Sequence, residues 1–233
     1  MNKGSGKGGY IGEITEGIMR NTHIIKIIGF IYQQLPAWRD DPEREQGQSE
    51  PELNPQLCKF LDIQTRSLLP MFAFYHEEPQ SSNRHVDLSV APVEAMDIGV
   101  INYTKYNPVL FIECKRLPAP SPDREKEYVT GADPNKKTGG IQRFKLGLHG
   151  GKYDIAAMIG YVQTRTFQEW HYQINKWILE FSGTSTTDGC TWTTDEGLTR
   201  LEENSLNKVA KYHSTHLRNS KKEIELYHLW IIM

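Results

Sequence analysis

Apolar residues along 11–35 keep the spacing of a helix with one buried face, and Pro36 marks its expected end. The same reasoning predicts a second helix over about 56–69 and a short one over 141–148. A further helix is predicted over 166–181, where aromatic and aliphatic residues share one face. These four segments give the chain its predicted helices.

Shorter apolar runs, bounded by turn residues, predict β-strands. They cover 71–75, 85–91, 96–103, 108–117, 154–162, 209–217 and 223–232. The last two runs are expected to pair as a C-terminal β-hairpin. Strands interspersed with helices favour an α/β fold, in which a mixed sheet forms the core and helices flank its faces.

The remaining segments lack a hydrophobic pattern. Residues 1–10 are rich in Gly and Lys and are expected to be a disordered tail. Residues 39–56 hold six carboxylates and three prolines, and 118–140 is rich in Pro, Gly, Asp and Lys, so both are predicted to be flexible loops. A polar loop is expected at 182–197. Residues 11–233 are accordingly expected to form a single domain.

Composition narrows the class of protein. With 38% hydrophobic and 24% charged residues, the chain has the composition of an ordinary soluble globular protein. A formal net charge of −2 gives no overall basic signal, so any nucleic-acid surface must be local. The three cysteines lie far apart, which favours a reduced, cytoplasmic protein. No membrane span is expected, because the most apolar stretch, 24–35, is short and interrupted by polar residues.

The run 109–117 is the most informative part of the chain. Four apolar residues predict a buried strand, and Glu113 and Lys115 follow two residues apart. Because strand side chains alternate, these two charges share a face while Cys114 points to the other. A buried strand has no packing reason to carry two charges on one face, which indicates a functional site.

A second candidate carboxylate for the site lies upstream of Glu113. Asp97 opens the preceding apolar segment, and fifteen residues separate it from Glu113, so a hairpin would bring the two side by side. With the backbone carbonyl of Cys114 they would form an oxygen site suited to Mg²⁺. Lys115 would orient or deprotonate a water, or stabilise phosphate charge. Asp87 is the rival, with 25 residues between it and Glu113.

This pattern of Asp97 followed by Glu113-Cys114-Lys115 after a β-run resembles the PD-(D/E)XK nuclease superfamily. The resemblance implies a restriction-endonuclease-like fold in which the Asp and Glu bind a divalent metal and the Lys assists the attacking water. It also implies an acid on the leading helix, here Glu13 or Glu16. Some members place a Gln on the helix after the E-x-K strand, which would correspond to Gln142.

A basic segment follows the predicted site. Residues 136–152 hold five basic residues and no acidic one, and a Gly-Gly turn opens a short helix whose N–H groups are a potential phosphate site. The segment makes Lys137, Gln142, Arg143 and Lys145 the candidates for contact with nucleic acid. A second basic stretch lies at 208–222.

Together these features predict a nuclease that uses Mg²⁺ or Mn²⁺ to hydrolyse DNA phosphodiester bonds, with double-stranded DNA favoured over single-stranded. A homodimer, or a subunit of a larger restriction or phage-defence complex, is expected by analogy alone. The alternatives are a non-catalytic nucleic-acid-binding or assembly subunit that keeps the fold, and a hydrolase of another phosphoester.

Overall fold

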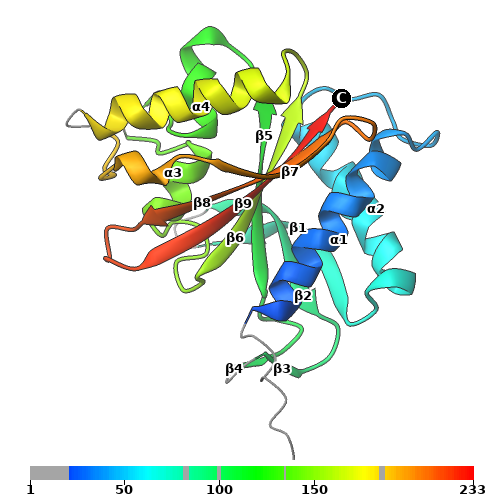
Figure 1. The fold of residues 1–233 in the computed structure, drawn as a ribbon. Coiled ribbons are helices and arrows are strands. Elements are labelled where there is room, and N and C mark those ends of the chain that lie inside the picture. Colours follow the sequence, from blue (N-terminus) through cyan, green and yellow to red (C-terminus); the bar gives the residue numbers. More distant parts are fainter. Residues whose placement is uncertain (1–20, 81–83, 99–100, 134, 184–186) are drawn as a thin grey trace, which may run out of the picture.

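A seven-stranded mixed sheet forms the centre of the molecule (Figure 1). The computed structural model describes residues 21–80, 84–98, 101–133, 135–183 and 187–233. The strands lie in the order β1-β2-β5-β6-β9-β8-β7; β5 pairs with β6 and β6 with β9 in parallel, and the other neighbours are antiparallel. Their bounds are β1 Phe72–Pro79, β2 His85–Pro92, β5 Leu110–Leu117, β6 Ile155–Val162, β7 Thr199–Asn204, β8 Val209–Leu217 and β9 Glu223–Ile232. The predicted mixed sheet is confirmed.

Helices cover both faces of this sheet, and each face has its own hydrophobic core (Figure 1). Alternation along β6 shows the division, because Ile155 and Ala157 pack into one core and Ala156 and Met158 into the other. Helices α1 (Thr22–Arg39) and α2 (Glu50–Leu68) lie on the first face. The 3₁₀ helix η1 (Pro122–Tyr128) and helices α3 (Gly140–Lys145) and α4 (Phe167–Ser182) lie on the second.

Two helix boundaries differ from the prediction. Helix α1 continues through Pro36 to Arg39, because the buried Trp38 anchors its last turn to the core. Helix α2 begins at Glu50 and not near residue 56, because Ser49 and Glu52 form a capping box at its first turn. The predicted flexible loop 39–56 therefore shrinks to the connection between these two helices. The first half of the predicted helix 11–35, with Glu13 and Glu16, and the predicted tail 1–10 lie outside the described residues.

The second predicted flexible loop, 118–140, is in large part structured. It contains η1, and Tyr128 and Val129 are buried in the core beneath α4. Tyr128 is a large aromatic residue and Val129 a β-branched apolar residue. Both favour burial in a core over exposure in a solvated loop.

The predicted C-terminal hairpin is confirmed as β8 and β9, but it is part of the main sheet. Strand β9 also pairs in parallel with the central β6, and β7 adds an edge that the sequence pattern did not predict. The predicted polar loop 182–197 includes a 3₁₀ turn, η2 (Thr194–Glu196), in which Glu196 is buried.

The predicted strand 96–103 is a separate two-stranded sheet. It consists of β3 (Met96–Ile98) and β4 (Ile101–Tyr103), which pair only with each other. This small sheet lies beyond one end of the main sheet (Figure 1). Among the described residues, no helix has the length and apolar character needed to cross a membrane.

Candidate functional site

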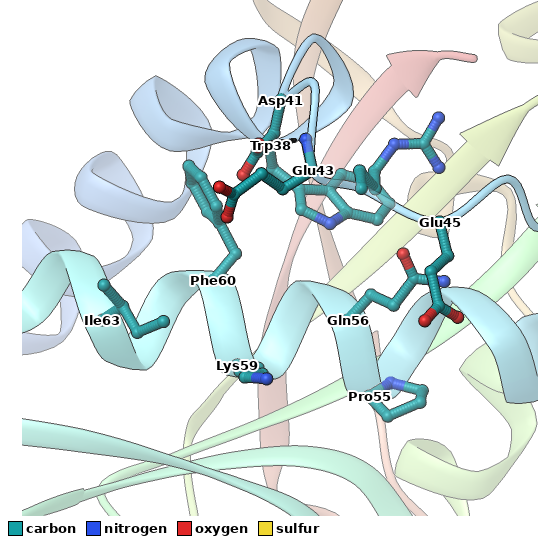
Figure 2. A pocket seen from close by; sticks show the side chains of 10 residues that line it. Trp38, Asp41, Glu43, Glu45, Pro55, Gln56, Lys59, Phe60 and Ile63 are labelled. Carbon is teal, nitrogen blue, oxygen red and sulfur yellow. Dashed lines mark hydrogen bonds between the residues drawn. The ribbon is translucent and has the colours of Figure 1, made fainter.

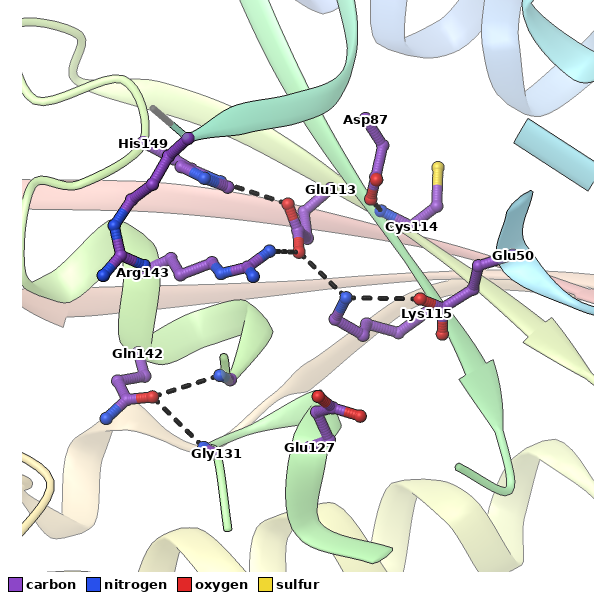
Figure 3. A network of polar contacts seen from close by, with 12 residues as sticks. Glu50, Asp87, Glu113, Cys114, Lys115, Glu127, Gly131, Gln142, Arg143 and His149 are labelled. Carbon is purple, nitrogen blue, oxygen red and sulfur yellow. Dashed lines mark hydrogen bonds and ion pairs between the residues drawn. The ribbon is translucent and has the colours of Figure 1, made fainter. Parts of the chain in front are cut away.

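Glu113 lies at the centre of a network of charged side chains in the middle of the main sheet (Figure 3). Strand β5, which carries it, runs between β2 and β6. The Glu113 side chain is fully buried and meets three basic groups. Its Oε1 atom lies 2.5 Å from Nη1 of Arg143 and 2.9 Å from Nζ of Lys115, and its Oε2 atom lies 3.1 Å from Nδ1 of His149. A buried carboxylate therefore has more basic neighbours than its one negative charge can neutralise.

These neighbours determine the charge of Glu113. Burial by itself would raise the pKa of the carboxyl, but Lys115, His149 and Arg143 outweigh it and hold that pKa well below its usual range. His149 is fully buried, its Nδ1 atom faces the Glu113 carboxylate, and its Nε2 atom has no hydrogen-bond partner among the described residues. The site thus holds an ionised glutamate beside an unsatisfied imidazole.

Lys115 lies between two carboxylates. Its Nζ atom is 2.9 Å from Glu113 and 3.4 Å from Glu50. Burial would lower the pKa of the ammonium, but Glu113 and Glu50 raise it above its ordinary value. Lys115 is therefore protonated at neutral pH, and it is suited to orient a water or stabilise negative charge and unsuited to accept a proton.

Glu50 belongs to this network and was not among the predicted site residues. It stands at the start of α2, where Oε1 accepts a hydrogen bond from the backbone N–H of Arg116 at 2.9 Å. The sequence carried a signal for it. The Ser49 to Glu52 capping box and Pro51 mark a helix start within the predicted loop 39–56.

Asp87, and not Asp97, lies beside Glu113. Strand β2 pairs with β5 through Leu88 and Ile112, so Asp87 and Glu113 are the next residues along that register. The Oδ2 atom of Asp87 accepts a hydrogen bond from the backbone N–H of Cys114 at 2.7 Å. Asp87 keeps some exposure, but its carboxyl group is largely surrounded by protein. This burial, and next to it the negative charge of Glu113, raises the pKa of Asp87 to about 7.

The predicted placement of Asp97 beside Glu113 is wrong. Asp97 is exposed on β3 and accepts a hydrogen bond from Asn102 of β4 at 2.8 Å. The fifteen-residue spacing is compatible with a hairpin that pairs Asp97 with Glu113. In the structure β3 pairs with β4 instead, and β2 is the strand that pairs with β5 on that side.

Gln142 holds the backbone near the site together. It is fully buried, and its Oε1 accepts hydrogen bonds from the N–H groups of Gly131 and Gly139, both at 3.1 Å. Its amide donates to the carbonyl of Asp188 at 2.9 Å. The predicted contact of Gln142 with nucleic acid is therefore wrong, and its role is to fix the start of α3.

The Gly-Gly turn serves close packing. A Cβ on Gly139 would lie 2.3 Å from the Thr130 Cα, and one on Gly140 would lie 2.4 Å from Met158 Cε and 3.5 Å from Lys115 Cγ. The Gly139 N–H is already bonded to Gln142. The turn predicted to bind phosphate instead brings α3 against Lys115.

The other three residues predicted to contact nucleic acid differ in their exposure and their partners. Lys145 is fully buried and forms an ion pair with Glu196 at 2.5 Å, so its predicted phosphate contact is wrong. Arg143 joins the site and keeps 20% of its side chain exposed. Lys137 is partly exposed, and its backbone carbonyl accepts hydrogen bonds from Arg84 and Arg143.

The residues around Glu113 are of the types that bind divalent cations. Glu50, Asp87, Glu113 and the carbonyl of Cys114 are hard oxygen donors in one neighbourhood (Figure 3). Their present partners are N–H and ammonium groups, and within the described residues no three acidic, His or Cys side chains converge on one point. Binding of Mg²⁺ would require Asp87 and Glu113 to exchange these partners for the ion.

Comparisons with known proteins gave no match to this chain among family models, curated proteins or solved structures. The function is therefore argued from the geometry of the site.

Proposed function

We propose that this protein is a divalent-metal-dependent nuclease that hydrolyses DNA phosphodiester bonds. One observation carries the proposal: buried Lys115 lies between the carboxylates of Glu50 and Glu113. Asp87 of β2 is hydrogen-bonded to the backbone of the intervening Cys114, so side chains from α2, β2 and β5 share this neighbourhood. The apolar strand β5 could have been completed with apolar residues, since replacing buried ion pairs by hydrophobic residues is often neutral or stabilising. The charged residues at this point therefore support a role in chemistry.

The proposed roles follow from the charges. Mg²⁺ or Mn²⁺ would be held by Asp87, Glu113 and the carbonyl of Cys114, with Glu50 beside them. When bound, the metal supplies a Lewis acid and an activated water. Lys115, kept protonated by its two carboxylate neighbours, would orient a water or stabilise negative charge on the phosphate. The exposed part of Arg143 contacts the phosphate on the solvent side.

The choice of double-stranded DNA, and of a homodimer or defence-complex subunit, rests on analogy with the resembled superfamily. The local basic segment that contains Lys137 and Arg143 supports an anionic polymer as the substrate.

One observation favours a second function, that of a non-catalytic nucleic-acid-binding or assembly subunit. The Glu113 carboxylate is already surrounded by Arg143, Lys115 and His149. This arrangement neutralises the carboxylate within the protein and leaves it less able to bind a cation.

A cleavage assay separates the two functions. Plasmid, linear and single-stranded DNA and RNA are each incubated with the protein and Mg²⁺, Mn²⁺ or EDTA. We expect metal-dependent cleavage of DNA that is lost in Asp87→Asn and in Lys115→Ala. Asp97→Asn is the matched control, because Asp97 is an exposed aspartate outside the network, and it should keep full activity.

Calorimetric titration with Mg²⁺ gives a readout besides activity. The wild type should bind the ion, and Asp87→Asn should bind it at least tenfold more weakly. DNA binding without cleavage, and without any detectable metal binding, would overturn the nuclease proposal in favour of the binding subunit. Activity that survives Lys115→Ala would contradict the role given to the lysine.

A further inference from the structure

Two arginine side chains lie together where the Glu113 network reaches solvent. Arg143 of α3 donates from Nη1 to Glu113 at 2.5 Å (Figure 3), and from Nε to the backbone carbonyl of Lys137 at 3.4 Å. Arg84, directly before β2, donates from Nη1 to that same carbonyl at 3.4 Å and to the carbonyl of Lys136 at 3.3 Å. Because they share one acceptor, the donor nitrogens lie within about 7 Å of each other, close enough for the two positive charges to repel.

Arg84 has no negatively charged partner among the described residues. It forms no ion pair with them, in contrast to Arg143, which is paired with Glu113. The carboxylate of the adjoining loop, Asp133, pairs with Lys136 at 3.7 Å. Two guanidinium groups are thus held side by side with a carboxylate bonded to one of them. An anion bound between the two would relieve their repulsion.

Both guanidinium groups keep N–H groups directed to solvent. A guanidinium has five N–H donors. Toward described residues, Arg84 uses Nη1 alone, and Arg143 uses Nε and Nη1. Neither side chain has a buried nitrogen without a partner, so the remaining donors reach solvent. These are Nε and Nη2 of Arg84 and Nη2 of Arg143, and both residues are partly exposed.

These open donors fit a phosphate group. Its oxygens are tetrahedrally arranged and can accept hydrogen bonds from two guanidinium groups at once. The Lys137 carbonyl holds one edge of each guanidinium, so the opposite edges are positioned before a ligand arrives. The neighbouring Lys136 is 74% exposed and adds positive charge that attracts a polyanion.

The cavity between α1 and α2 offers a contrast (Figure 2). Two cations, Arg44 and Lys59, line it together with three carboxylates, Asp41, Glu43 and Glu45. The wall of that cavity therefore carries charges of both signs and gives an anion no clear advantage. The paired arginines are the better place for a phosphate.

We propose that Arg84 and Arg143 together bind one phosphate group of a nucleic-acid backbone at the opening of the Glu113 network. Arg84 donates from Nε and Nη2 and Arg143 from Nη2, while the Lys137 carbonyl keeps the two side chains in place. The choice of nucleic acid as the ligand rests on the proposed function. The binding itself needs neither a metal ion nor cleavage, so it can be tested separately.

The main test measures binding to labelled duplex DNA by fluorescence anisotropy in EDTA, where the phosphodiester bonds stay intact. Arg84→Gln and Arg143→Gln should each raise the Kd about fivefold at low salt, because each loses a charge-assisted hydrogen bond to the phosphate. In the double variant the factor should be clearly smaller than the product of the two, because both side chains hold the same group. Arg200→Gln is the matched control, since Arg200 is an exposed arginine on the edge strand β7, and it should bind as the wild type does.

A small probe distinguishes one phosphate site from attraction to the whole polyanion. The Nε–H resonance of Arg84, assigned by its loss in Arg84→Gln, should shift when inorganic phosphate replaces chloride at constant ionic strength. The shift should be much smaller in Arg143→Gln, which lacks the second guanidinium. A tetraglutamate peptide at the same concentration should shift the resonance less than phosphate does.

Four results would overturn the shared phosphate site. They are duplex binding by Arg84→Gln equal to that of Arg200→Gln, single factors that multiply in the double variant, an Arg84 resonance unmoved by phosphate, and a larger shift with the peptide, which would indicate an acidic protein as the partner. Failure of the nuclease proposal gives a different result, namely coupled losses of binding without any cleavage in Mg²⁺. Conversely, metal-dependent cleavage with unchanged affinity in Arg84→Gln would leave the nuclease proposal standing and remove this one.

Discussion

Lys115 and Lys145 both form ion pairs with buried glutamates, yet their surroundings differ. Lys145 contacts both oxygens of Glu196, at 2.5 and 2.6 Å, and donates to the Leu217 carbonyl at 3.1 Å. Glu196 accepts a further hydrogen bond from the Leu217 N–H at 3.0 Å. The three donor positions of the ammonium are thus matched by three acceptors, and the pair joins η2 to α3 and β8 inside the core.

The Lys115 pair is open to solvent. Glu113 faces three basic groups, and both Glu50 and Arg143 keep about a fifth of their side-chain surface exposed. One pair is closed, and the other reaches solvent. The comparison shows that a buried charge is not by itself a sign of function, and that a charged network with a route to solvent is the more informative sign.

Removing each lysine charge tests this comparison most severely. Under the proposed function, we expect Lys115→Met to lower DNA cleavage per folded molecule about 10³-fold, which is the effect of removing a charge-stabilising group from an active site. Lys145→Met, the same change in the closed pair, should lower stability but leave cleavage per folded molecule close to that of the wild type. Folded protein is quantified by near-UV circular dichroism before each rate measurement. Equal losses of activity in the two variants would show that the pairs do not differ in function.

The stabilities should follow the opposite order. Glu196→Gln leaves the buried Lys145 ammonium without its counter-charge and should lower the free energy of unfolding by about 3 kcal/mol. Glu113→Gln should lower it by only about 1 kcal/mol, because Lys115 keeps Glu50 as a partner and the mutual repulsion of the basic groups can relax toward solvent. Urea unfolding at pH 7 measures both values. A larger loss in Glu113→Gln would show that the Glu113 network is structural.

The sequence allowed part of this comparison to be predicted. Alternation along β5 placed Glu113 and Lys115 on one face, because strand geometry depends only on neighbouring residues. The spacing between Asp97 and Glu113 could not reveal that β3 and β4 pair with each other and leave Asp87 beside β5. Spacing limits how far a chain can reach, but it does not say which strand lies next to which.

The wrong predictions for Gln142 and Lys145 have a similar cause. Gln142 and Lys145 stood in a segment without acidic residues, so a solvent-facing groove was a reasonable expectation. Their partners, Asp188 and Glu196, lie more than forty residues away along the chain. Only the tertiary fold brings them together, and no local pattern marks them as buried. Glu50 differs, since its capping box was present in the sequence.

Histidines that extend the closed network should make it sensitive to acid. His216 and His228 share the Ser214 hydroxyl, with both nitrogen to Oγ distances at 2.7 Å, and burial lowers the pKa of each imidazole. Below the ordinary histidine pKa of about 6.5 the unfolded chain takes up protons that the folded protein does not, so stability is lost as pH falls and is unaffected above it. Each histidine should contribute about 1.4 kcal/mol per pH unit.

Urea unfolding at pH 7.5, 6.5 and 5.5 measures this slope. His228→Gln should give a shallower fall in stability than the wild type, even where its stability at pH 7.5 is lower. His213→Gln is the control, because His213 lies on the neighbouring strand β8 and is partly exposed. Parallel curves for wild type and His228→Gln would show that the closed network does not set the acid sensitivity.

The smallest expected effect concerns the open side of the Glu113 network. Arg143→Gln removes one partly exposed positive charge, so DNA affinity should fall by a similar factor for all sequences and the slope of log affinity against log salt should decrease by about one. Lys136→Gln removes a charge from the same basic segment, but Lys136 is 74% exposed and outside the network, so it should change the slope less. Fluorescence anisotropy with labelled duplex DNA at several salt concentrations measures both slopes. If the two variants behave alike, the basic segment attracts DNA through its overall field, and Arg143 has no special position at the opening to Glu113.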